Sequence, residues 1–136
     1  MKVLLAICNL CQRAFYYRPT AAIVNLPLPD AFYLERFEGM LVTLPQTLTV
    51  PDTYDLPKYG EIVVANGRLL HPTQVATPGQ AANTLQAQND LNQLVIDDGR
   101  AGNYRTPFAY HFSANNPVRT GSTVTNLTGV LHYDFG

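Results

Sequence analysis

The fold is decided by the stretch LERFEGMLVTLPQTLTV, which covers residues 34–50. Residues 40–44 are strongly β-forming, and residues 47–50 alternate polar and apolar side chains, as a half-buried strand does. Pro45 separates the two runs, because a proline cannot donate a hydrogen bond to a strand ladder. The stretch therefore predicts a strand, a break and a second strand, which is how a small β-barrel begins.

Three further strands are predicted C-terminal to this stretch. Residues 60–65 form an apolar run that ends at Asn66-Gly67, and both of these residues tolerate the positive φ of a tight hairpin turn. Residues 68–70 are therefore predicted to be the return strand of a hairpin. Residues 94–96 form a compact buried strand that stops at the turn residues Asp97-Asp98-Gly99.

Strands are also expected nearer both ends of the sequence. Residues 21–24 suit an edge strand or a linker, because the nearby Pro27 and Pro29 lack backbone donors. Residues 123–133 have the pattern of one long strand. We expect this strand to bend at Gly129, since a glycine permits a bulge or a barrel corner.

Helix is expected in two places at most. Asp30 could cap one helical turn over residues 31–37. Residues 80–92 are rich in Ala, Gln and Asn and can hold a short helix, although its apolar stripe is thin, and residues 72–79 have the composition of a loop. The fold class predicted from the whole pattern is all-β: a small OB-fold-like β-barrel of five or six strands with one short helix at most.

The composition fits one folded domain that does not hold nucleic acid by charge alone. The chain has 136 residues, of which 46% are hydrophobic and only 14% are charged, so a packed core is feasible. Its formal net charge is −1. Domains that bind nucleic acid through charge are clearly basic.

Residues 1–18 are predicted to be an atypical N-terminal segment ahead of a single domain over residues 19–136. Lys2 and the apolar run over residues 3–7 imitate a signal peptide, but the run is too short before Asn9 to be convincing. The same run is alternatively a first strand. No segment approaches the roughly 20 apolar residues of a membrane span, so no membrane partner is expected.

The sequence lacks the motifs of common enzymes and metal sites. It contains no G-x-S-x-G, no H-E-x-x-H and no glycine-rich phosphate-binding motif. Cys8 and Cys11 form C-x-x-C, but no helix follows that would stabilise a redox thiolate, and the three histidines lack the spacing of zinc ligands. We therefore interpret the two cysteines as ordinary thiols, and we expect no catalytic residue, metal or cofactor.

Aromatic and basic side chains in loops are the candidates for contact with nucleic acid. Bases stack on exposed aromatic rings, and arginines contact phosphates. The alternatives are rings that cap the core and arginines that are simply solvated. The candidate nucleic-acid-binding residues are Tyr59, Arg100, Tyr104, Arg105, Tyr110 and Arg119.

A series of stretches in a fixed order carries a family resemblance. They are LERFEGMLV (34–42), QTLTV (46–50), YGE (59–61), GRL (67–69), PT (72–73), AQNDLN (87–92), DDG (97–99) and LTGVLHYDFG (127–136). They make residues 19–136 resemble a region of the bacterial extracellular sugar-non-specific endonucleases of the ExeM/NucH type, which are related to the YhcR-like OB-fold nucleases. In that family, the region lies between an N-terminal OB-fold module and a C-terminal metal-dependent endonuclease/exonuclease/phosphatase domain.

The resemblance implies a non-catalytic OB-like accessory module of a secreted nuclease, which assists nucleic-acid binding or domain positioning. It implies an extracellular or periplasmic location and DNA or RNA as a partner. Because the sequence stops at Gly136, where the family continues into the catalytic domain, we carry over no active-site residue, and this chain alone is expected not to be an enzyme. A truncated gene is one expectation. The alternative function is a structural or interaction domain that self-associates as a homodimer and binds no nucleic acid.

Overall fold

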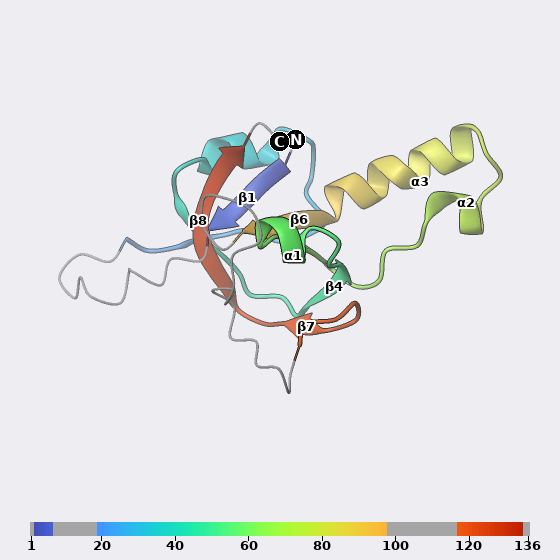
Figure 1. The fold of residues 1–136 in the computed structure, drawn as a ribbon. Helices are drawn as coiled ribbons and strands as arrows, with labels where there is room; N and C mark the ends of the chain where they lie inside the picture. Colours follow the sequence, from blue (N-terminus) through green and yellow to red (C-terminus); the bar gives the residue numbers. More distant parts are fainter. Residues whose placement is uncertain (1, 7–18, 98–116, 135–136) are drawn as a thin grey trace.

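The computed structural model describes residues 2–6, 19–97 and 117–134. These residues contain eight strands and three α-helices (Figure 1). A short 3₁₀-helix, η2, covers Tyr33–Phe37. The α-helices are α1 (Leu56–Tyr59), α2 (Pro72–Val75) and α3 (Gln80–Leu91). The strands are β1 (Lys2–Ala6), β2 (Ala22–Ile23), β3 (Leu41–Leu44), β4 (Leu48–Asp52), β5 (Ile62–Ala65), β6 (Gln93–Asp97), β7 (Thr123–Val124) and β8 (Leu127–Asp134).

The strands form two open sheets that β1 joins. The order across the whole ladder is β2-β3-β8-β1-β6-β5-β4-β7, so β2-β3-β8 is a sheet of three strands and β6-β5-β4-β7 a sheet of four. Between them, β1 pairs antiparallel with β8 and parallel with β6. The remaining neighbours are antiparallel, except β2 and β3, which are parallel.

Two short connections force this ladder to curl. β3 and β4 belong to different sheets, yet only residues 45–47 join them, and only residues 125–126 join β7 to β8. Four extended backbone steps span at most about 14 Å, and three span about 11 Å. The far edge of the four-stranded sheet must therefore lie close to the three-stranded sheet.

The predicted all-β, OB-fold-like β-barrel is wrong. The described chain is mixed α/β and 26% helical, and its curled sheet stays open because the outer strands β2 and β7 are not paired with each other. The run over residues 40–44 and the alternation over residues 47–50 did identify β3 and β4 correctly. Local patterns of this kind report which segments are strands, but they do not report whether the sheet closes.

The hairpin predicted at Asn66-Gly67 is also wrong. Gly67 has the positive φ expected of such a turn, 84°. Residues 68–70, however, form no strand. The strand that follows β5 in the sequence and pairs with it is β6, which comes after α2 and α3. The residue pair predicted the turn of the backbone, but the two strands that pair with β5 are β4 and β6.

One helical prediction is confirmed, and two helical segments differ from expectation. The short helix predicted over residues 80–92 is confirmed as α3, but the stretch predicted as loop over residues 72–79 contains α2. Helices α2 and α3 pack against each other and project from the sheets as an arm (Figure 1). At η2, Phe32 occupies the N-cap position, and Asp30 instead accepts a hydrogen bond from the Phe32 N–H at 2.9 Å.

The long strand predicted over residues 123–133 is broken in two. Asn126 has a positive φ of 50°, a conformation that Asn adopts more readily than most residues, and it separates β7 from β8. Gly129, where the bend was expected, lies inside β8 opposite Val42 of β3. The break lets β7 pair with β4 while β8 pairs with β1 and β3.

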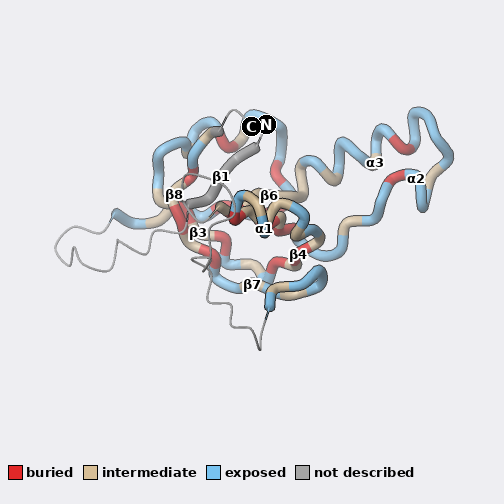
Figure 2. Tube along the Cα trace, viewed as in Figure 1, coloured by how far each residue is buried: buried red, intermediate tan, exposed pale blue. Residues whose placement is uncertain are grey.

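One hydrophobic core is shared by both sheets (Figure 2). The alternating strands each send every second side chain into it, as the period of a strand requires. The segment before η2 adds a row of its own to the same core. The buried members are Val24, Leu26, Leu28, Leu34, Val42, Leu44, Leu48, Val50, Ile62, Val64, Leu94, Ile96, Leu127 and Leu131.

The buried backbone of Leu26 is paired by side chains instead of by a strand. The Leu26 N–H donates to Gln46 Oε1 at 2.7 Å, and Gln46 Nε2 donates to the Leu26 carbonyl at 2.8 Å. Asn66 Nδ2 donates to the same carbonyl at 3.0 Å. The amide of Gln46 thus replaces a missing strand neighbour, and it ties the segment before η2 to the β3–β4 connection.

Truncation of a core leucine should test this packing. Leu44 is fully buried, and Leu44→Ala should lower the free energy of unfolding by about 2–5 kcal/mol, because it leaves a cavity between the sheets. The matched control is Leu70→Ala, since Leu70 is 41% exposed and should cost less than about 0.5 kcal/mol. Urea denaturation followed by circular dichroism measures both. Equal losses would contradict the assignment of Leu44 to the core.

Removal of the Gln46 amide should leave a buried N–H without a partner. We expect Gln46→Ala to lower the free energy of unfolding by about 1–3 kcal/mol, the cost of an unsatisfied buried polar group. Gln88→Ala, on the exposed face of α3, removes the same amide with no expected effect. Chemical denaturation of both variants provides the comparison, and an unchanged midpoint for Gln46→Ala would show that the amide pair adds no stability.

Candidate functional site

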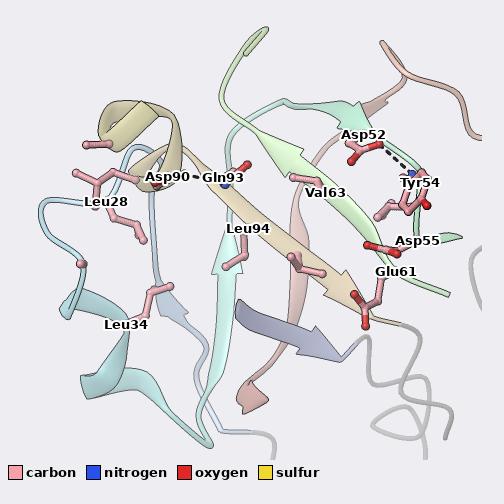
Figure 3. Close-up of a pocket in the computed structure, with 15 residues that line it drawn as sticks. Leu28, Leu34, Asp52, Tyr54, Asp55, Glu61, Val63, Asp90, Gln93 and Leu94 are labelled. Atoms are coloured by element: carbon pink, nitrogen blue, oxygen red, sulfur yellow. Dashed lines mark hydrogen bonds between the residues drawn. The ribbon is translucent and has the colours of Figure 1, made fainter. Parts of the chain in front are cut away.

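An open pocket of about 720 Å³ lies where the four-stranded sheet meets the C-terminal end of α3 (Figure 3). Three separate parts of the chain build it: the segment from residue 28 to η2, the end of β4 with the turn into α1 and β5, and the α3–β6 junction. Its lining residues are Leu28, Ala31, Leu34, Asp52, Tyr54, Asp55, Glu61, Ile62, Val63, Ala87, Asp90, Leu91, Gln93, Leu94 and Val95.

The floor of the pocket is apolar and belongs to the core. Leu28, Leu34 and Leu94 line one side, and each is at least nine-tenths buried. The Leu28 N–H donates to the Leu91 carbonyl at 2.7 Å, which fixes the segment before η2 against the end of α3. This side of the pocket is therefore held by the same packing that holds the fold.

Among the residues that the structure describes, four carboxylates line the pocket, and no Lys, Arg or His does. Asp52, Asp55 and Glu61 lie at one end, together with Tyr54, whereas Asp90 lies at the other end beside Gln93 (Figure 3). The charged side chains of this described lining are therefore all negative. The pocket therefore favours a ligand with a cationic group and an apolar part, and it repels phosphate.

Neutral donors orient two of these carboxylates. Asp52 Oδ1 accepts the Tyr54 N–H at 2.9 Å. Asp90 Oδ1 accepts from Gln86 Nε2 at 2.7 Å and, more weakly, from Gln93 Nε2 at 3.4 Å. Amide and backbone donors position a carboxylate but leave its charge in place, so both groups remain available to a cation.

The arrangement is not that of a metal centre. Within residues 19–97 and 117–133, whose side chains are described, no three His, Cys, Asp or Glu side chains come close enough to hold a metal ion together. His71 bonds Thr73 Oγ1 through Nδ1 at 2.9 Å, and His132 is exposed on β8. Cys8, Cys11 and His111 lie outside the described residues.

Two of the predicted nucleic-acid-binding residues are described, and the structure does not bring them into contact. Tyr59 ends α1, is 39% exposed, and has Lys58 Nζ 4.5 Å from its ring centroid. Arg119 is exposed in a turn that is bonded to Val50 of β4 through its Gly121 and Ser122 backbone. Arg100, Tyr104, Arg105 and Tyr110 lie outside the described residues, so the six-residue site stays a prediction.

Sequence spacing gave no sign of the pocket. Asp52, Asp55, Glu61 and Asp90 belong to no motif that a single sequence reveals. Three of them lie within residues 52–61, and Asp90 lines the same pocket because β5 and β6 are neighbours although α2 and α3 separate them along the chain. A carboxylate cluster assembled from distant segments leaves no motif in a single sequence.

Comparisons with known proteins identify a family but no activity. No curated protein and no solved structure matches the chain. Within the described residues, no helix is long and apolar enough to cross a membrane. One family model, with the description "Domain of unknown function (DUF8508)", matches residues 31–136, which include every element from η2 to β8. This match covers most of the sequence, and the chain therefore belongs to the DUF8508 family.

Proposed function

We propose that this chain is a non-catalytic accessory module of a secreted sugar-non-specific nuclease, and that it positions a neighbouring domain by direct protein contact. The observation that carries the proposal is the acid-lined, apolar-floored pocket. Leu34, Glu61 and Asp90 line this pocket, and all three belong to the stretches that resemble the extracellular endonucleases. These stretches also lie entirely inside residues 31–136, the single region that the family model covers.

Contact with protein accounts for the pocket better than contact with nucleic acid does. The net charge of −1 gives little general attraction for a polyanion. The four carboxylates of the lining would add repulsion wherever a phosphate approached the pocket. Of the two roles that the resemblance implies, domain positioning is therefore the one we favour.

The proposal assigns this chain no catalytic step, because the resemblance places that step in another domain. Metal-dependent hydrolysis of a phosphodiester uses ions held by several converging carboxylates or histidines. The carboxylates of the pocket are spread over both of its ends, and no group of three suits a metal among residues 19–97 and 117–133. The catalytic step of the nuclease would then belong to another domain.

The purified chain should not cut nucleic acid. We expect plasmid DNA and total RNA to remain intact after incubation with the chain and Mg²⁺, Mn²⁺ or Ca²⁺, with a non-specific nuclease as the positive control. Gel electrophoresis measures the result. Hydrolysis that co-purifies with the protein through a second chromatographic step would overturn the proposal.

Titration with single-stranded DNA should give weak binding or none, even at low salt, because the charges are unfavourable. Fluorescence anisotropy of a labelled oligonucleotide measures this. Tight binding that Tyr104→Ala and Arg105→Ala each weaken would instead favour the nucleic-acid role of the predicted residues.

The alternative function is self-association as a homodimer. The structure gives a reason to expect a monomer instead. The outermost strands of the described sheet, β2 and β7, are two residues long, so they present few free backbone groups to another copy. Sedimentation velocity over a hundredfold range of concentration tests the expectation. A sedimentation coefficient that rises with concentration would favour the interaction domain.

A further inference from the structure

We propose that the pocket binds a segment of a partner polypeptide in which an arginine is flanked by apolar side chains. The inference rests on the proposed function, and it names the chemistry of the partner that the module would hold. The volume of about 720 Å³ falls in the range of sites that take a few side chains or a small ligand. A single occupant of this kind would contact both the apolar floor and the acidic end of the pocket, which Asp52, Asp55 and Glu61 form.

The floor offers apolar contact that is already rigid. Leu28, Leu34 and Leu94 are 8%, 4% and 3% exposed, so most of each side chain is fixed by the core and only a small face remains for a ligand. Val63 and Val95, which pair across β5 and β6, add two half-buried apolar side chains to the lining. Because the surface is preformed, a bound apolar side chain does not have to order it first.

The acidic end of the pocket supplies the negative charge that a guanidinium needs. Asp52, Asp55 and Glu61 come from one short stretch between the end of β4 and the start of β5, so they lie at one end of the pocket (Figure 3). A guanidinium carries five donors in a planar fork and can engage more than one carboxylate oxygen at once. An ammonium lacks this fork, which is why we expect arginine and not lysine.

Tyr54 is an independent pointer to the same group. Its side chain is 84% exposed, although an aromatic ring of this size is ordinarily covered. It lines the pocket beside the carboxylates, and the bond from its N–H to Asp52 fixes its backbone there. An exposed ring next to carboxylates is the surrounding in which a guanidinium can stack and form ion pairs at the same time.

Other ligands fit less well. Phosphates, nucleic acids and anionic lipid surfaces carry the charge that the acidic end repels. The carboxylates do not converge on one point, so an isolated divalent cation lacks a ligand set in the described residues. A basic and apolar peptide meets neither obstacle.

The test uses the whole chain and a defined probe, the fluorescein-labelled peptide Leu-Arg-Leu-Arg-Leu with blocked ends. Anisotropy at low salt should show saturable binding, and high salt should weaken it. Leu-Glu-Leu-Glu-Leu should not bind, and Leu-Lys-Leu-Lys-Leu should bind more weakly than the arginine peptide. The double variant Asp52→Asn with Asp55→Asn should weaken binding about fivefold, as expected when two exposed or partly exposed ion pairs are lost.

A matched variant separates the pocket from general charge. Glu35→Gln with Glu38→Gln removes the same two charges from exposed positions of η2 and its C-cap, outside the pocket lining, and should change the affinity less than twofold. Should the pocket double variant unfold, Tyr54→Ala replaces it, because a ring that is 84% exposed adds little to stability. That variant should also weaken binding several-fold.

The outcomes are distinguishable. Equal losses in the two double variants, equal binding of the glutamate peptide, or no binding at any salt concentration would each overturn the inference. Saturable binding of a labelled single-stranded oligonucleotide that the pocket double variant weakens would overturn it in favour of nucleic acid. None of these results depends on the cleavage assay, so the proposed non-catalytic role can fail while peptide binding persists, and the reverse.

Discussion

The shortness of two connections is the constraint on which the rest of the structure depends. Three residues between β3 and β4, and two between β7 and β8, carry the chain from one sheet to the other. These lengths oblige the two sheets to face a common interior. There, side chains from β3 and β8 of one sheet meet those of β4, β5 and β6 of the other. Gln46, in the first connection, also satisfies the buried backbone of Leu26. A single stretch of sequence thus joins the sheets and fixes the segment that leads into η2.

The pocket follows from the same constraint. Its floor consists of core leucines, and only a small part of each is exposed where the C-terminal end of α3 meets β6. Its acidic end is the route by which the chain leaves β4, forms α1 and returns as β5. The ligand surface is therefore a by-product of the way the sheet is built, and its shape should be as stable as the core itself.

The sequence predicted the strands of this protein far better than it predicted their arrangement. The alternation around Pro45 located β3 and β4, and the Ala-, Gln- and Asn-rich stretch located α3. Closure could not be predicted, because it depends on whether β2 and β7 meet, and neither strand carries a pattern that reports its partner. The pocket could not be predicted for the same reason: Glu61 and Asp90 become neighbours of one cavity only through the pairing of β5 with β6.

The arm formed by α2 and α3 has a different relation to stability. Within α3 only Ala82 is buried, and the remaining positions are exposed or half-exposed (Figure 2). A helix with so little anchorage contributes little to the cooperative unfolding of the domain and can open by itself at low cost. Insertions, deletions or substitutions in its outer half should consequently cost the domain little stability, whereas the end near Asp90 and Leu91 is held to one geometry by the sheet that follows.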